Sequence, residues 1–342
     1  MTDHVKQLIE KLEREAAILL DAYSSSIEPI HQERLKRQYD RKLAEIAEWK
    51  VRLAAVSENT SSRVGVESPS SKPPATGLSS AATLDKGLGT GKRWAVLAGA
   101  MEYDDGASYG ALDVCLNDVN AVRNRLLAGG YEDQRVALLA DDAPEPPTRN
   151  RILRMLEFIA RQTESDDLLL FYYTGHGDYT ASESYLVARD GYSDSLSKTA
   201  VSLTDVKEIV QKAEARAKVI IIDACHSGVN LGVKGGRPMS PEFIQRVFEQ
   251  AEGMAVLASC KQGERSYVWA GEQASVFTHY LIEALEGKAD RDAKELVTVQ
   301  DVNRYVLDWV QDWALRNRVT QTPTLECKVA GDIILVDYRK GP

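Results

Sequence analysis

Two short glycine-flanked motifs hold the residues of this chain that could do chemistry. His176 stands in the sequence GHG at the end of the apolar run 167–175, and Cys225 stands in DACHSG after the run 218–224. A thiolate is the reactive form of cysteine, and a neighbouring imidazole can take its proton and later protonate a leaving amine. The two motifs therefore indicate nucleophilic catalysis by a His-Cys pair.

Apolar runs alternate with helical patterns from residue 93 onward, and they must position these two side chains. Buried strands separated by helices predict an α/β domain with a mostly parallel sheet covered on both faces. Ligands bind outside the carboxyl ends of such strands, where His176 and Cys225 would meet. The predicted strands are 93–100, 135–140, 167–175, 218–224, 254–260 and 332–336, and the predicted helices lie near 116–129, 148–163, 203–216, 240–252, 274–287 and 299–317.

The glycines beside the two motifs fit a site that a peptide carbonyl approaches closely. Glycine allows tight turns and close contact of a ligand with the main chain. We expect the main-chain N–H groups of Gly177 and Cys225 to hold the oxyanion that forms during acyl transfer.

The pair of motifs resembles the caspase-like cysteine peptidases of peptidase family C14, which include caspases and metacaspases. His176 precedes Cys225 by 49 positions, as in that family. The segments 111–126 and 257–285 also resemble metacaspase segments, and the whole resemblance covers 93–337. It implies the caspase-hemoglobinase fold with a six-stranded, mostly parallel sheet, His176 as the general base and Cys225 as the nucleophile.

The resemblance also implies two acids in the primary specificity pocket, Asp118 and Asp223. Caspases have glutamine at the position of Asp223, together with arginines that select an acidic residue. Two carboxylates would repel an acidic side chain and favour Arg or Lys before the cut bond. Asp118 has an alternative role, because acids are also favoured near helix starts, where they cap or remain solvated.

Metal and cofactor binding are not predicted. The acidic cluster of calcium-binding metacaspases is not evident after His176, where Asp190 and Asp194 are the acids to test for calcium. Zinc binding by His176, Cys225 and His226 is an alternative, but a structural zinc site requires four ligands at recognisable spacing.

The glycine-rich segment 228–241 contains two basic residues, Lys234 and Arg237. A pocket for basic residues makes this loop a candidate for self-cleavage, with Arg63 and Lys72 as lesser candidates. The alternative is that these side chains are solvated loop charges.

The chain is predicted to carry a separate N-terminal module. Residues 1–56 form two amphipathic stripes with ten acidic and ten basic residues, which predicts a helical hairpin that needs a covering partner. Residues 57–92 are rich in Ser, Pro and Gly and predict a flexible linker before the peptidase domain at 93–342. A solvated hairpin without a specific partner is the alternative.

Composition narrows the possible partners. The net charge of -9 argues against a nucleic-acid surface, because phosphate neutralisation requires clustered Lys and Arg. No apolar run approaches the ~20 residues of a membrane span. The charged start of the chain does not resemble an export signal, and four cysteines do not form a disulfide framework, so we expect a reducing cytoplasm.

These observations together predict a cytoplasmic cysteine endopeptidase that cleaves protein or peptide substrates after Arg or Lys. By analogy of layout, residues 1–56 would recruit it to a sensor or adaptor in a bacterial defence or regulated-death system. Two alternatives are an inactive caspase-like scaffold and another thiol acyl-transfer enzyme.

Overall fold

The computed structural model describes residues 91–226, 233–234, 253–261, 264–269, 271–329 and 331–340, together with residues 17, 20, 36, 43 and 50. Of residues 225, 226, 233, 234 and 340 it describes the backbone alone. The chain divides into two compact units, Met1–Leu78 and Ser79–Pro342, and every element below belongs to the second. Apart from those five single residues, the predicted hairpin lies outside the described residues, as do the linker as far as residue 90 and the predicted helix 240–252.

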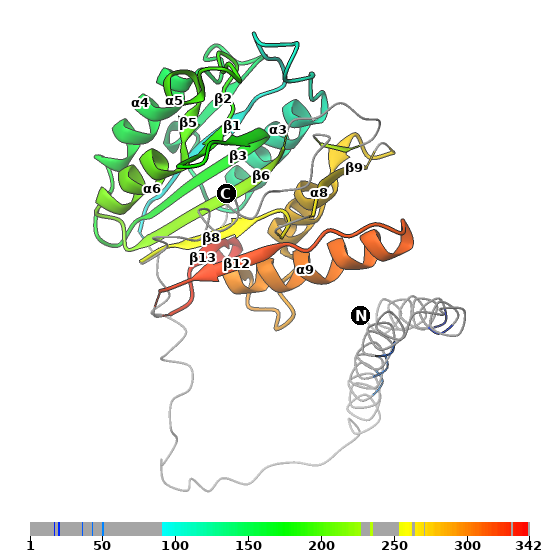
Figure 1. The fold of residues 1–342 in the computed structure, drawn as a ribbon. Helices are drawn as coiled ribbons and strands as arrows, with labels where there is room; N and C mark the ends of the chain where they lie inside the picture. The colour runs from blue at the N-terminus through cyan, green and yellow to red at the C-terminus, as the bar shows by residue number, and fades with distance from the viewer. Residues whose placement is uncertain are drawn as a thin grey trace, which may run out of the picture. The chain divides into compact units, whose positions relative to one another are not determined.

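The second unit is built on one large sheet in which five neighbouring strands run parallel (Figure 1). Along the main path the order is β12-β8-β6-β3-β1-β2, with β12 antiparallel at the edge, while β4 pairs with β3 and β5 pairs with β4. The strands are β1 (Arg93–Gly99), β2 (Val136–Ala140), β3 (Leu168–Tyr179), β4 (Ser184–Leu186), β5 (Val201–Ser202), β6 (Ala217–His226), β8 (Ala255–Ala258) and β12 (Thr324–Cys327).

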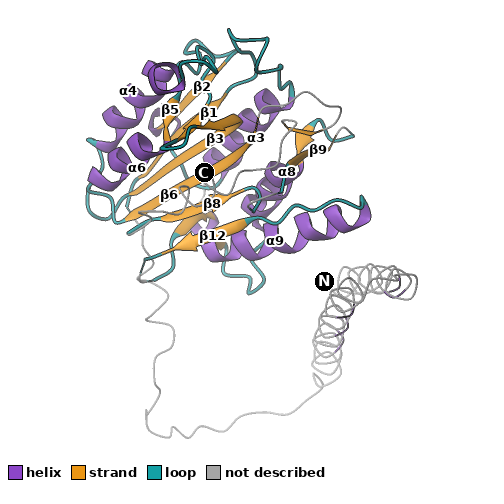
Figure 2. Cartoon of the chain, viewed as in Figure 1, coloured by secondary structure: helices purple, strands orange, loops and turns teal. Residues whose placement is uncertain are grey.

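Helices cover both faces of this sheet (Figure 2). Alternate residues of the central strands enter two separate apolar cores, as the period of two in a strand requires. One core includes α3 (Val114–Ala128), α8 (Val276–Glu283) and α9 (Val299–Arg316), and the other includes α4 (Arg149–Ala160) and α6 (Leu203–Lys212). The shorter helical elements are η2 (Asp133–Arg135), α5 (Leu196–Thr199), η3 (Ala284–Lys288, a π-helix) and η4 (Tyr338–Lys340).

The central strands are buried because both faces are covered. The run Leu168–Tyr173 at the start of β3 is almost fully inaccessible to solvent, which explains why it is continuously apolar rather than alternating. Among the described residues, no helix has the length and apolar character needed to cross a membrane.

One predicted strand belongs elsewhere. The run 332–336 does not join the large sheet: it overlaps β13 (Ile334–Asp337), which pairs with β11 (Leu296–Thr298) in a separate two-stranded sheet. Its apolar side chains fill the core beside α3 and α9, so the pattern indicated burial but not the pairing partner. The sixth position on the main path is taken by β12, whose sequence TLEC is half-buried throughout and gives no apolar signal.

A three-stranded sheet lies beside α8. Its order is β10 (Ala274–Ser275), β9 (Ser266–Trp269) and β7 (Val233–Lys234). Both pairings are antiparallel, and the register sets Lys234 of β7 opposite Ser266 of β9.

Candidate active site

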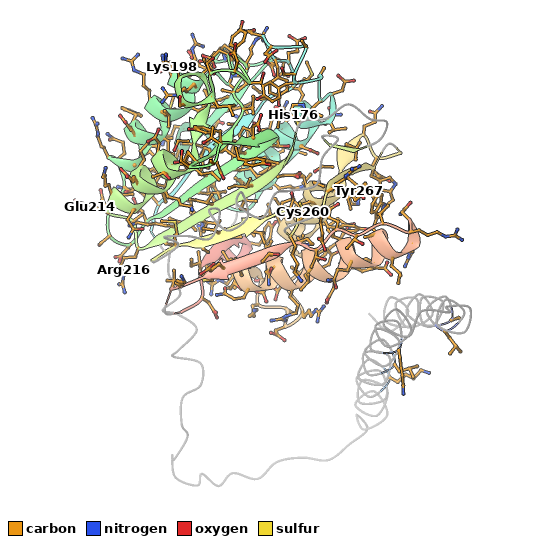
Figure 3. All side chains as sticks on the ribbon, in the orientation of Figure 1. His176, Lys198, Glu214, Arg216, Cys260 and Tyr267 are labelled. Carbon is orange, nitrogen blue, oxygen red and sulfur yellow. The ribbon has the colours of Figure 1, made fainter. Side chains whose placement is uncertain are left out.

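The two chemical motifs meet on neighbouring strands. His176 lies toward the end of β3 (labelled in Figure 3), and the parallel register between β3 and β6 sets its Cα opposite that of Cys225. Adjacent strands in a sheet are about 4.8 Å apart. The same register sets Thr174 opposite Asp223, two residues earlier on both strands. The residues that sequence analysis placed at one edge are therefore side by side in the backbone.

A main-chain carbonyl orients the imidazole of His176. The side chain is 3% exposed, and its Nε2 atom lies 2.8 Å from the carbonyl oxygen of Gly110. A carbonyl oxygen can only accept a hydrogen bond, so Nε2 must carry a proton. In the neutral ring the lone pair is then on Nδ1, which makes Nδ1 the basic nitrogen of the site.

Three tyrosines surround His176. The Tyr103 hydroxyl accepts a 3.0 Å hydrogen bond from the His176 main-chain N–H and donates to the Ala100 carbonyl at 2.8 Å. The Tyr173 hydroxyl lies 2.8 Å from the His176 carbonyl oxygen. The rings of Tyr103 and Tyr109 lie 4.9 and 5.7 Å from the imidazole. Tyr172 and Tyr173 would be expected to pack in the sheet; both are buried, but the Tyr173 hydroxyl also holds the main chain of His176.

The two hydroxyls also explain Gly175. A Cβ atom at this position would lie 2.9 Å from the Tyr103 hydroxyl and closer still to that of Tyr173. Residue 175 also has a φ angle of +158°, a backbone conformation that residues with a side chain rarely adopt. Glycine is thus required for the tyrosines to reach the main chain of His176.

Both tyrosines next to the imidazole remain protonated. Burial raises the pKa of Tyr103 well above its ordinary value. Burial, followed by the hydrogen bond to Asp178, also raises the pKa of Tyr109, whose hydroxyl donates to that carboxylate at 2.7 Å. These phenols therefore act as neutral hydrogen-bonding groups over the ordinary pH range.

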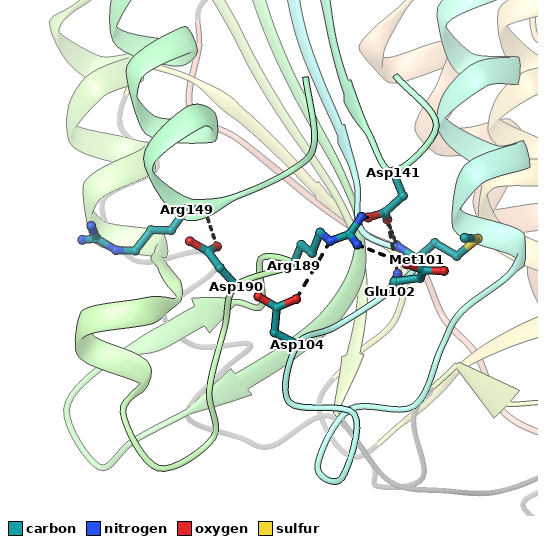
Figure 4. A network of polar contacts seen from close by, with 7 residues as sticks. All are labelled: Met101, Glu102, Asp104, Asp141, Arg149, Arg189 and Asp190. Carbon is teal, nitrogen blue, oxygen red and sulfur yellow. Dashed lines mark hydrogen bonds and ion pairs between the residues drawn. The ribbon is translucent and has the colours of Figure 1, made fainter. Parts of the chain in front are cut away.

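An arginine fixes the loop that carries Tyr103 and Gly110, residues 100–112, which we call the His176 loop (Figure 4). The Arg189 guanidinium lies 2.8 Å from Asp141 and 3.3 Å from Glu102. Asp141 in turn accepts the Met101 main-chain N–H at 2.7 Å, and the Arg189 carbonyl accepts that of Asp104 at 2.8 Å. The start of the His176 loop is therefore held by charge-assisted contacts to two other segments.

The two predicted pocket acids also come together. Asp118 on α3 and Asp223 on β6 are both 0% exposed. Ser275 joins them, because its main-chain N–H donates to Asp118 at 3.1 Å and its hydroxyl donates to Asp223. Asp118 thus accepts a bond from a distant segment, which differs from the helix-capping alternative, while Asp113 occupies the N-cap position of α3.

Three hydroxyls donate to the Asp223 carboxylate. Ser266 donates to Oδ1 at 2.9 Å, while Thr278 at 2.8 Å and Ser275 donate to Oδ2. The Ser275 hydroxyl also accepts the Thr278 main-chain N–H at 3.1 Å, so it caps α8 as well. Hydrogen bonds donated to a carboxylate stabilise its ionised form, which allows a charge to persist in this buried place.

The remaining candidate residues that the structure describes are not gathered at one site. The Asp190 carboxylate accepts the Arg149 main-chain N–H at the start of α4, and Asp194 is exposed. Among the described residues, no three His, Cys, Asp or Glu side chains form a group that could hold a metal ion. Cys115 and Cys260 are buried and Cys327 is half-buried. Gly177 pairs with Leu186 and His226 in the backbone, while Arg63, Lys72 and Arg237 lie outside the described residues.

Most of the groups that support the candidate residues cannot be recognised from the sequence. Gly110, Tyr103 and Ser275 bind the candidate residues from other segments, and Gln321 binds Ser266. Gln321 begins the stretch Gln-Thr-Pro, whose composition indicates only a turn that leads to the last strand. The buried hydroxyls and the amide have no periodic pattern, so their sequence gave no signal.

A parallel sheet with a histidine and a cysteine opposite each other on neighbouring strands is the arrangement expected of a class of thiol peptidases, and comparison with known proteins agrees. A family model described as Caspase domain (Peptidase_C14) matches residues 92–334. The chain therefore belongs to the caspase-domain family C14 of cysteine-type endopeptidases.

The individual relatives found by sequence comparison include fungal metacaspases. Metacaspase-1 of Botryotinia fuckeliana is 30% identical over 199 residues, covering 52% of this chain and 45% of the relative. Metacaspase-1 of Pyricularia oryzae is 29% identical over 223 residues, covering 60% of this chain and 53% of the relative. The chain thus spans about half the length of these curated relatives.

The solved structure of Caspase-1 from Spodoptera frugiperda has the same fold. It superposes with a TM-score of 0.52 at 15% identity, covering 75% of this chain and 94% of that one. The α/β caspase-hemoglobinase fold expected from the sequence is confirmed.

Proposed function

We propose that the chain is a cysteine endopeptidase in which His176 is the general base and Cys225 the nucleophile. The observation that carries this proposal is the register of β3 and β6, which sets the two residues opposite each other. The Gly110 carbonyl adds to it, because it leaves Nδ1 of the imidazole as the basic nitrogen.

The reaction follows from these groups. Nδ1 takes the thiol proton, and the Cys225 sulfur attacks the scissile carbonyl carbon, whose oxygen becomes an oxyanion near the main-chain N–H groups of Gly177 and Cys225. The imidazolium then protonates the leaving amine as the C–N bond breaks. Water, deprotonated by the same imidazole, hydrolyses the thioester and frees the sulfur. No metal or cofactor enters this sequence.

We propose that the enzyme cleaves after Arg or Lys. Asp118 and Asp223 are both buried, and both carboxylates accept hydrogen bonds from Ser275, which stabilise negative charge on them. A guanidinium or ammonium group would offset that charge, whereas an acidic side chain would be repelled.

Self-cleavage after Lys234 is a further part of the proposal. Backbone pairing sets Lys234 opposite Ser266, the residue whose hydroxyl donates to Asp223. A basic residue of the chain itself thus belongs to the strand next to the proposed pocket. Arg237 stays a second candidate, and intact-mass analysis of wild type and Cys225→Ala would locate the cut.

The cellular role is proposed on the layout of the chain. Residues 1–56 would bind a sensor or adaptor protein and bring the peptidase to its substrates in a cytoplasmic bacterial defence or regulated-death system. Neither nucleic acid nor a membrane is proposed as a direct partner.

A peptide panel tests the activity and its specificity together. Reporter peptides with Arg, Lys, Asp or a neutral residue before the reporter are assayed with wild type and Cys225→Ala. We expect turnover of the Arg and Lys peptides by wild type alone, and labelling of Cys225 by an arginyl chloromethylketone. No turnover and no labelling would support the inactive scaffold instead. Labelling with transfer to other acyl acceptors would indicate another thiol acyl-transfer enzyme, and cleavage after Asp would overturn the pocket assignment.

A further inference from the structure

A buried glutamine lies behind the proposed specificity pocket. Gln321 precedes β12 and is 1% exposed. Its Nε2 atom lies 3.0 Å from the Ser259 carbonyl oxygen and 3.2 Å from the Ser266 hydroxyl. Its Oε1 atom accepts the main-chain N–H of Tyr267 at 3.0 Å. One amide therefore contacts the residue after β8 and the first two residues of β9.

Two main-chain groups fix the orientation of this amide. The Ser259 carbonyl can only accept and the Tyr267 N–H can only donate, so the nitrogen and oxygen of Gln321 cannot exchange places without losing both bonds. The amide group therefore presents a donor, not an acceptor, to the Ser266 hydroxyl.

This orientation determines the direction of the next hydrogen bond. A serine hydroxyl has one proton, and because Gln321 donates to the Ser266 oxygen, that proton is available to Asp223 Oδ1 at 2.9 Å. Successive hydrogen bonds with the same direction polarise and strengthen one another. The chain Gln321 to Ser266 to Asp223 thus ends in a donor aimed at the carboxylate, and all three residues are buried.

We propose that Gln321 is a positioning residue that determines specificity for basic substrates. It acts through Ser266, by holding β9 in place and by turning the Ser266 proton toward Asp223. This inference rests on the proposed function, because it requires Asp223 to bind the basic side chain of the substrate. It predicts that Gln321 affects recognition of charge while leaving the His-Cys chemistry intact.

The neighbouring Thr322 offers a matched control. Thr322 is also buried and also contacts the segment around β9, but it does so through Glu264, two residues before this strand. The Glu264 carboxylate accepts hydrogen bonds from the main-chain N–H and the hydroxyl of Thr322. Thr322→Val removes a hydroxyl and keeps the shape of the side chain. This substitution removes the hydroxyl bond to Glu264 and leaves the hydrogen bonds of Ser266 in place.

The experiment measures kcat/KM for two peptides that differ only in Arg or its uncharged isostere citrulline before the reporter. Full-length wild type, Gln321→Met, Ser266→Ala, the double variant and Thr322→Val are compared. We expect Gln321→Met to lower the Arg-to-citrulline ratio about tenfold, mainly through KM for the Arg peptide. Ser266→Ala should lower it similarly, the double variant should add little, and Thr322→Val should leave the ratio unchanged.

The outcomes separate this inference from the proposed function. A wild type without preference for Arg over citrulline contradicts the proposed specificity itself. A wild type with that preference, whose ratio is unchanged in Gln321→Met or falls equally in Thr322→Val, overturns the role of Gln321. Should Gln321→Met fail to fold, Ser266→Ala decides, because an unchanged ratio there removes the proposed path to Asp223.

Discussion

His176 and Asp223 lie on neighbouring strands, yet different kinds of contact hold them. The imidazole of His176 bonds to a main-chain carbonyl, and its own main chain bonds to Tyr103. The carboxylate of Asp223 instead accepts hydrogen bonds from the side-chain hydroxyls of Ser266, Ser275 and Thr278. The orientation of the imidazole thus depends on the path of the His176 loop, whereas the Asp223 carboxylate depends on small side chains that single substitutions can remove.

This difference suggests that catalysis and specificity can be altered separately. Changes on the histidine side should lower turnover of every substrate by a similar factor. Changes on the pocket side should alter the ratio between charged and uncharged substrates. Turnover and the Arg-to-citrulline ratio are therefore both measured for each variant. A histidine-side variant that changes the ratio, or a pocket-side variant that lowers turnover of both peptides equally, would contradict the comparison.

The largest effect is expected for His176→Ala. Loss of the base should lower kcat on the Arg peptide by about 10³-fold or more, since removing one member of such a catalytic pair has effects of that order. The control is His279→Ala, a histidine on α8 whose ring lies 4.9 Å from that of Trp269. His279→Ala should keep its activity, and a wild-type rate in His176→Ala would refute the assignment of the base.

The next effect is expected for Asp223→Asn. The substitution keeps the shape of the side chain but removes the charge, so the Arg-to-citrulline ratio should fall roughly 100-fold. Asp190→Asn is the matched control, because it changes an acid that accepts the N–H of Arg149 at the start of α4. Equal loss of turnover on both peptides would indicate that Asp223 supports the fold rather than specificity.

The sequence predicted where the two motifs lie better than it predicted the groups that support them. His176 and Cys225 each stand in a short motif directly after a buried strand, and parallel strands bring such motifs to one edge. The donors to Asp223 are 43 and 52 residues away for Ser266 and Ser275. Nothing local distinguishes these serines from surface serines, so their role follows only from the tertiary structure.

Burial was likewise easier to predict than pairing. The apolar run 332–336 was expected in the large sheet but contributes to β13 in a separate sheet, whereas β12, which was not predicted as a strand, forms the edge of the large sheet. Apolar composition indicates how deeply a strand is buried, whereas its pairing partner is set by the tertiary structure. Helix α9 was predicted within about one residue of its observed bounds, and the structure shows a capping box of Thr298 and Asp301 at its start.

A smaller effect is expected for Tyr103→Phe. The change removes the hydroxyl that accepts the His176 N–H and donates to the Ala100 carbonyl, leaving two buried main-chain groups without this partner. We expect kcat to fall about tenfold on both peptides, with KM and the Arg-to-citrulline ratio of kcat/KM unchanged. Tyr109→Phe loses only a bond to Asp178 and should have a weaker effect; the reverse order would show that Tyr103 does not position the histidine.

The smallest effect on activity is expected for Arg189→Ala, which tests whether the His176 loop transmits its anchoring to the imidazole. Arg189 bonds to the buried carboxylate of Asp141 and to Glu102, so its removal should lower the free energy of unfolding by roughly 1–3 kcal/mol. It should lower kcat a few-fold on both peptides, because the loop carries Tyr103 and Gly110.

The control for this charge deletion is Lys92→Ala. Lys92 pairs with Glu164 on the surface, where the two side chains are 40% and 69% exposed, so its loss should change stability by less than about 1 kcal/mol. Denaturant unfolding and the two peptides measure both variants. An Arg189→Ala enzyme with a changed Arg-to-citrulline ratio would show that the His176 loop also shapes the pocket, and the separation of catalysis from specificity would then fail at this residue.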